Sequence, residues 1–346
     1  MRFAIKKKTF SIAVAAMVAS LLVLVTINTT ARPANVNQDV GVLRVAQSIP
    51  LPGVKGRIDH IATDIGGQRL FIAALGNDTL EIVDLRSGKR IHSITGLREP
   101  QDVTYVPEIN RIFVSNGASG SVSIFGSRSL RYEGNITFRE DADNLRYDAH
   151  SKYLYVGYGK GSLGVTDVMS GKIIGDIRLA GHPEAFQLET KGPRIFVNIP
   201  SARQVAVVDR DKRSVIAVLP LKESGNFPMA LDEKRHRLFI GCRRPATMLV
   251  YDTESGREVA RIDIGRDVDD ISYDPVHRQI YTSCGEGFID VIRQTEADHY
   301  EVTARLKTAR GARTSRFEPE SMLFYLAVPS ESGKSAEIRV YDFLTK

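Results

Sequence analysis

The sequence predicts an all-β fold, a seven-bladed β-propeller with four-stranded antiparallel blades, and three observations support it. A short core in which an aromatic residue follows an apolar one recurs at spacings of 42, 42, 41, 43, 42 and 44 residues. An acidic residue stands seven positions before six of these seven aromatics. Short apolar stretches alternate with turn residues and show no helical period; four strands in about 42 residues are typical of one blade. The core aromatics are Phe71, Phe113, Tyr155, Phe196, Phe239, Tyr281 and Tyr325.

The first unit shows the order of the elements within a blade. Asp64 precedes two glycines, and an acidic side chain there favours a tight turn because it accepts hydrogen bonds from nearby backbone amides. The strand core follows at 70–72, a second strand ends at Asp84, and a Ser-Gly turn leads to an outer strand at 89–94. One blade alone leaves two apolar faces uncovered, so the blades are expected to pack around an axis.

The last unit lacks a fourth strand. Its three strands are expected at 314–317, 322–328 and 337–343, after which the chain ends. The segment 42–49 has the character of a fourth strand and precedes the first unit. We therefore predict that it pairs with the last blade and closes a single propeller over residues 41–346.

These units resemble the YVTN β-propeller repeat (YncE-like) family. The resemblance is carried by the Arg69–Ile72 core and the Val83–Lys89 turn, as repeated from Val42 to Lys346. It implies an exported binding protein, in a family of mostly undefined ligands with one DNA-binding branch. The sixth unit departs from the repeat through a longer turn at 294–299.

The N-terminus is typical of an export signal. Basic residues between Arg2 and Lys8 precede an apolar run from Phe10 to Ile27, and small residues end at Ala31. We expect a signal peptide at 1–31 or, alternatively, an uncleaved anchor, followed by a linker at 32–40 and a periplasmic or secreted, monomeric protein. The formal net charge of the chain is +6, and four basic residues of this segment account for four of these charges. The rest of the chain has a net charge of only +2, because 6 − 4 = 2. So small a net charge gives no general indication of nucleic-acid binding.

Chemistry is expected at the mouth of the ring where the loops enter the inner strands. The residues eleven and twelve positions before each core aromatic include acids in five of the seven units. The candidate ligand-binding residues at this mouth and just below it are Asp59, His60, Asp102, Asn144, Arg146, His182, Glu184, Asp270 and Arg313.

Three functions are considered for the residues at this mouth of the ring. No complete catalytic set is legible, which favours a non-enzymatic binding or scaffold protein for a small ligand, a metal ion or a protein partner. The second is a metal-dependent hydrolase, similar in residue type to lactonase propellers, with His60 as base and a divalent cation such as calcium. Its ligands would be Asp59, Asn144, Glu184 and Asp270. The third is a DNA-binding propeller led by Arg243 and Arg244, although stacking aromatics are few.

The acids also have a purely structural interpretation. They can accept hydrogen bonds from loop amides and pair with Arg146, Arg313 and Arg316 in a wet channel. Cys242 and Cys284 share one repeat position in neighbouring units. We interpret them as two buried small apolar side chains, with a disulfide or a metal site as the alternatives.

Overall fold

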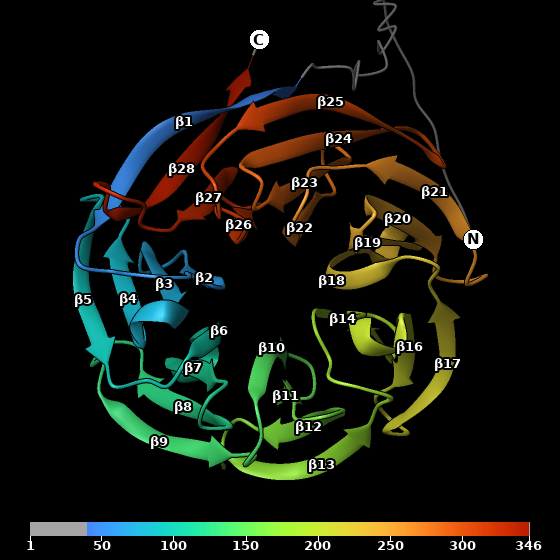
Figure 1. Cartoon of the computed structure of the whole chain (residues 1–346). Helices are drawn as coiled ribbons and strands as arrows, with labels where there is room; N and C mark the ends of the chain where they lie inside the picture. Colours follow the sequence, from blue (N-terminus) through green and yellow to red (C-terminus); the bar gives the residue numbers. More distant parts are fainter. Residues whose placement is uncertain (1–39, 346) are drawn as a thin grey trace, which may run out of the picture. The chain divides into compact units, whose positions relative to one another are not determined.

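A computed structural model describes residues 40–345 of the chain, which form a ring of seven four-stranded antiparallel sheets (Figure 1). The predicted export signal and almost all of the predicted linker lie outside these residues. In the described range, no helix is long and apolar enough to cross a membrane. The fold is therefore the predicted seven-bladed propeller, with blades 1 to 7 following the order of their innermost strands along the chain.

The first four blades follow one another along the chain. Blade 1 contains β2 (Ile61–Asp64), β3 (Arg69–Ala74), β4 (Thr79–Asp84) and β5 (Lys89–Thr95). Blade 2 contains β6 (Pro100–Val106), β7 (Arg111–Asn116), β8 (Ser121–Gly126) and β9 (Tyr132–Thr137). Blade 3 contains β10 (Ala142–Asp148), β11 (Tyr153–Tyr158), β12 (Ser162–Asp167) and β13 (Lys172–Arg178). Blade 4 contains β14 (Phe186–Leu188), β15 (Arg194–Ile199), β16 (Gln204–Asp209) and β17 (Ser214–Pro220).

The remaining three blades complete the ring. Blade 5 contains β18 (Ser224–Asp232), β19 (Arg237–Arg244), β20 (Ala246–Asp252) and β21 (Glu258–Asp263). Blade 6 contains β22 (Val268–Asp274), β23 (Gln279–Cys284), β24 (Phe288–Glu296) and β25 (His299–Lys307). Blade 7 contains β26 (Ser315–Glu318), β27 (Leu323–Val328), β28 (Ala336–Thr345) and β1 (Val40–Leu51). Short 3-10 turns lie at η1 (Leu75–Asn77), η2 (Pro107–Ile109), η3 (Pro200–Ala202) and η4 (Glu233–Arg235).

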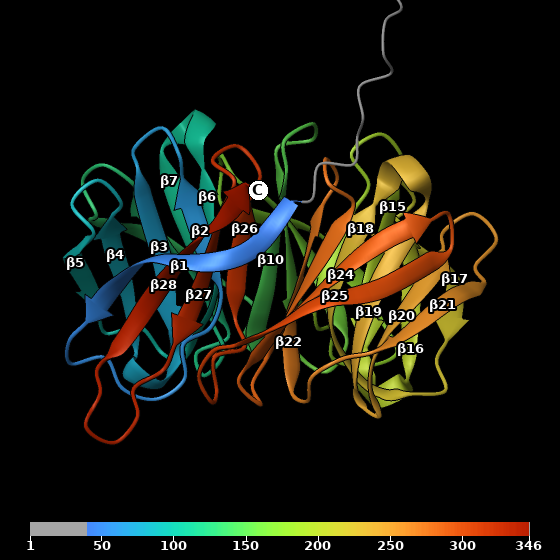
Figure 2. The ribbon, with the colours of Figure 1, turned by 90° about the horizontal axis from the view of Figure 1, so that it is seen from above.

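The ring closes through its first strand, as the sequence predicts. β1 is the outermost strand of blade 7 and runs antiparallel to β28, with Ile49 opposite Ile338 and Leu43 opposite Phe343. Figure 2 shows β1 crossing the outer side of blade 7 beside β28. Ile49 and Leu51 are fully buried. The strand therefore contributes core side chains as well as backbone hydrogen bonds.

The second strand of each blade divides its side chains between two blade interfaces. In β3, Leu70 and Ile72 pack against blade 7, whereas Phe71 packs against blade 2. This division follows from the two-residue period of a strand. Because blades cover both faces, the core strand is continuously apolar rather than alternating. Each core aromatic lies in the interface with the next blade, so the seven aromatics supply one large ring to every interface.

Candidate functional site

The loops that enter the innermost strands meet at a cavity of about 220 Å³, called here the upper cavity. It receives the residue twelve positions before the core aromatic from every blade. These residues are Asp59, Gln101, Asp143, Glu184, Phe227, Asp269 and Arg313. The regular phase of the repeat thus brings seven side chains, distant in sequence, to one axial site.

A second cavity of about 420 Å³, called here the lower cavity, borders the inner strands. His60 and Ala185 line both cavities. Asp102, Arg146 and Asp270 line the lower cavity, together with apolar side chains such as Leu145. The predicted candidates are therefore divided between two levels of one channel.

Asp102 and Asp270 connect neighbouring blades in the way that the structural interpretation describes. The Asp102 carboxylate accepts hydrogen bonds from the Leu145 amide at 2.8 Å and from Arg146 Nη1 at 3.0 Å. The Asp270 carboxylate accepts one from the Ser315 amide at 2.6 Å. Burial raises the pKa of Asp270 to about 6. Both acids therefore hold one blade to the next at the level of the channel.

Asp59 and His60 form a charged pair at the entrance to β2. Asp59 is 2% exposed and lies 2.9 Å from Arg57. Burial raises the pKa of the Asp59 carboxyl, although the charges of His60 and Arg57 oppose that rise. The His60 ring nitrogens lie 4.0 Å from Asp59 and 3.8 Å from Asp270. Burial lowers the pKa of His60, but the surrounding carboxylates outweigh it and raise the pKa to about 9.

The arginines of the upper cavity lie on its blade 5, 7 and 1 side and are neutralised there. Arg243 pairs with Asp269 and lies over the Phe227 ring, 4.0 Å from its centroid. Arg313 reaches Asp267 at 2.8 Å and Asp269 at 2.9 Å. Arg57 contacts Asp59 as described above. Because its guanidinium is held by carboxylates, Arg243 offers little to a nucleic-acid phosphate.

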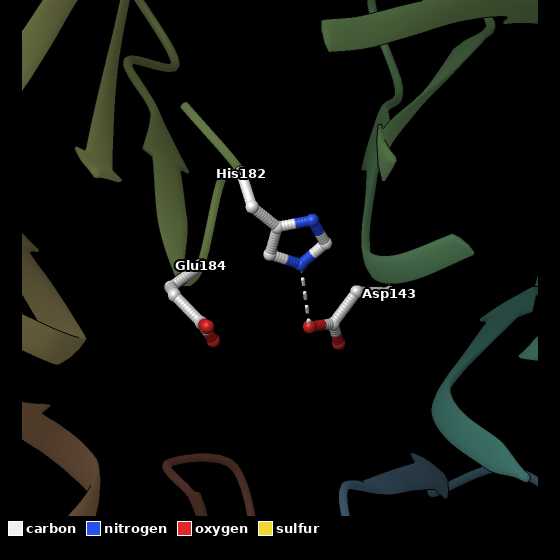
Figure 3. Close-up of side chains that lie close together, drawn as sticks. All are labelled: Asp143, His182 and Glu184. Atoms are coloured by element: carbon white, nitrogen blue, oxygen red, sulfur yellow. Dashed lines mark hydrogen bonds and ion pairs between the residues drawn. The ribbon is translucent and has the colours of Figure 1, made fainter. Parts of the chain in front are cut away.

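On the blade 3 and 4 side of the upper cavity, carboxylates outnumber basic side chains. Asp143, His182 and Glu184 offer ligand atoms that all lie within 4.8 Å of one another. Figure 3 shows the His182 ring directed at Asp143, with the Glu184 carboxylate beside them. His182 Nε2 lies 3.4 Å from Asp143 Oδ2. A further acid, Asp141, lines the same side and accepts a hydrogen bond from Gln101 at 2.8 Å.

Contacts with the backbone orient the His182 ring and hold the loop that carries Glu184. His182 Nδ1 lies 2.5 Å from the carbonyl oxygen of Gly159, in the turn between β11 and β12. Gly159 has a φ of +60°, and a Cβ there would lie 2.7 Å from a side-chain oxygen of Glu140, so glycine suits this turn. The Glu184 amide donates to the Asn198 carbonyl at 3.0 Å, and the Asn198 amide donates to Ala185 at 3.1 Å. The loop before β14 is thus tied by hydrogen bonds to the β11–β12 turn of blade 3 and to β15 of blade 4.

The electrostatics of this side reflect its excess of carboxylates. Burial raises the pKa of Glu184, and the charge of Asp143 raises it further. Burial lowers the pKa of His182, but the contacts with Asp143 and the Gly159 carbonyl outweigh it and raise the pKa. Asn144 is 2% exposed; its Nδ2 donates to Asp143 at 3.2 Å, and its Oδ1 has no hydrogen-bond partner among the described residues. Negative charge and an unused acceptor therefore converge here.

The structure brings six of the nine sequence candidates to the upper cavity, namely Asp59, His60, Asn144, His182, Glu184 and Arg313. Of the four predicted metal ligands, Asp270 lines the other cavity, so the set as a whole does not surround one point. The sequence predicts Asn144 as a metal ligand, whereas the structure groups its neighbour Asp143 with His182 and Glu184. The sequence also does not predict Asp269 as the partner of Arg243 and Arg313. Asp143 and Asp269 both stand twelve positions before a core aromatic, and this shared position is the sequence signal that identifies them.

The two cysteines are structural. Cys242 and Cys284 are fully buried and are free thiols. Burial raises the pKa of each to about 12. The interpretation as small buried apolar side chains is therefore confirmed.

Comparison with known proteins supports the fold. No family model matches the sequence, and no curated protein matches it significantly. A chain of a mitotic checkpoint complex structure is 12% identical, with a TM-score of 0.73 over 98% of this chain and 99% of that one. A chain of hydrazine synthase from Kuenenia stuttgartiensis is 15% identical, with a TM-score of 0.74 over 86% and 99%. The WD40 repeats of RRP9 are 11% identical, with a TM-score of 0.76 over 88% and 100%. These likenesses show a propeller of repeated blades.

Proposed function

We propose that this chain is an exported, non-enzymatic binding propeller of the YVTN-repeat kind that takes a small cationic ligand into its upper cavity. Propellers commonly serve as scaffolds, and the residues of the site rather than the fold must indicate the ligand. Export is proposed from the sequence of residues 1–31. The charge distribution of the cavity supports a ligand of positive charge.

One observation carries this proposal: among the described residues, at least two carboxylates of the upper cavity lack an arginine or lysine partner. The lining includes five acids, Asp59, Asp141, Asp143, Glu184 and Asp269, three arginines and two histidines, His60 and His182. The arginines are engaged with Asp59, Asp269 and the nearby Asp267. Among the described residues, Asp143 and Glu184 have no arginine or lysine within salt-bridge distance. A partly buried site of this kind attracts positive charge.

Titration calorimetry on the full chain tests the sign of the ligand. The probes are a divalent metal chloride, 1,4-diaminobutane and citrate. We expect at least one cationic probe to bind with unit stoichiometry and the citrate trianion not to bind. The double variant Asp143→Asn/Glu184→Gln should weaken cation binding by about tenfold or more, which is about 1.4 kcal/mol.

The matched control replaces two acids that lie outside the upper cavity. Asp263 is exposed on the outermost strand β21 of blade 5, and Glu296 is exposed at the end of β24, so Asp263→Asn/Glu296→Gln should bind cations as the unchanged protein does. Binding of citrate in place of both cations, or unchanged cation binding in the first double variant, contradicts the proposal. Fractionation of cells that express the full chain tests export separately.

A further inference from the structure

We infer that Asp143, His182 and Glu184 form a binding site for a divalent transition ion of the zinc class. This inference rests on the proposed function and identifies its cationic ligand as a metal. Two ligands of a tetrahedral ion with bonds of about 2.0–2.1 Å lie roughly 3.3–3.4 Å apart. His182 Nε2 and Asp143 Oδ2 are 3.4 Å apart, so this pair already has the spacing of two ligands on one ion. The Glu184 carboxylate lies within 4.8 Å of both.

The hydrogen bond on the far side of the imidazole orients His182 as a ligand. A carbonyl oxygen can only accept, so the Nδ1 atom that lies 2.5 Å from the Gly159 oxygen carries a proton. Nε2 then faces Asp143 either with a second proton or with its lone pair. The 3.4 Å separation is longer than the ~2.7–2.9 Å of a charge-assisted hydrogen bond. A cation between the lone pair and the carboxylate satisfies both groups, and a carbonyl behind the imidazole is the usual support of a metal-binding histidine.

Asn144 provides an independent observation. Its side chain is almost completely buried and borders the same cavity, yet its Oδ1 has no partner among the described residues. Leaving such a buried acceptor unsatisfied destabilises the folded protein. Three protein ligands leave a coordination position for water, and a water bound to the ion could donate a hydrogen bond to this oxygen. The unused acceptor therefore fits a hydrated ion beside Asp143.

The donor set selects the class of metal. Calcium takes six to eight oxygen ligands, whereas imidazole nitrogen suits zinc and its neighbours in the transition series. Here one nitrogen and two carboxylates converge from two adjacent blades. The calcium expected from the sequence is therefore the less suitable ion for these three side chains.

The test is calorimetric titration of the full chain, purified without a histidine tag, with zinc chloride, calcium chloride and 1,4-diaminobutane in parallel. Zinc should bind with unit stoichiometry and more tightly than calcium. His182→Gln should weaken zinc binding by about tenfold or more, while any binding of the diamine, which needs only the carboxylates, should change less than about threefold. Glu184→Gln provides a second variant should the first fail to fold.

His236→Asn is the matched control. His236 also lies 3.4 Å from a carboxylate, that of Glu254, but both side chains are more than half exposed and lie outside the cavity. Zinc affinity should be unchanged in this variant. Binding of the diamine without zinc, or of calcium in preference to zinc, overturns the metal assignment and leaves the proposed function standing. Binding of none of the three cations overturns both.

Discussion

Replacing Phe113 by alanine should measure the strength of one blade interface. Phe113 is fully buried between blades 2 and 3, in a cluster that includes Ile136 and Leu145. An aromatic side chain removes about 150–250 Å² from water, which at ~25 cal/mol/Å² gives about 4–6 kcal/mol. Alanine keeps part of this burial, and buried Phe→Ala changes accordingly cost about 3–5 kcal/mol. We expect a loss of unfolding free energy in this range.

The assay is urea unfolding followed by far-ultraviolet circular dichroism and tyrosine fluorescence, because the chain has 12 tyrosines and no tryptophan. Tyr132→Ala is the control on the same blade. Tyr132 is 61% exposed on the outer strand β9, so its loss should cost less than about 1 kcal/mol. Equal costs for the two variants would refute the assignment of the core aromatics to the blade interfaces.

Three further outcomes follow from burial and charge. Ile49→Ala should cost about 2–5 kcal/mol in urea unfolding, whereas Val45→Ala, half exposed on the same strand, should cost little; similar costs would contradict the closure by β1. In the folded protein, Cys242 and Cys284 should resist a thiol reagent at neutral pH and react after unfolding, and rapid native labelling would contradict their burial. The pKa of His60 rises from 6.5 to about 9 on folding, so its stabilisation is complete below pH 6.5 and is lost as pH rises through 9. His60→Gln should flatten that part of the stability–pH curve, and an unchanged slope would contradict the charged state of His60.

The period of the repeat explains why so much of the fold was predictable. A strand core that recurs every 42 residues or so fixes the number of blades, and the missing strand in the last unit leaves only the segment of β1 to complete it. The same phase predicted that the polar residues before each core strand converge on the axis. Local sequence and global fold agree at these positions, as expected of a repeat architecture.

The sequence does not predict how deep in the channel each polar side chain lies, because the innermost strands are irregular where they begin. Register shifts lie between Pro100 and Val103, Ala142 and Leu145, and Val268 and Asp270. A shift of one residue sends a side chain to the opposite face. In blades 2, 3 and 6 the bulges therefore influence the direction of these polar side chains, and no residue type in the sequence marks them.

The pairing of β1 with β28 also constrains when the ring can be completed. β1 is synthesised before every other described strand and β28 after all of them, so the seam must wait until β28 has left the ribosome. Until then Ile49 and Leu51 lack their partners in blade 7. We expect a product truncated before β28 to keep an open edge, which makes it a template for aggregation and a ready target for proteolysis.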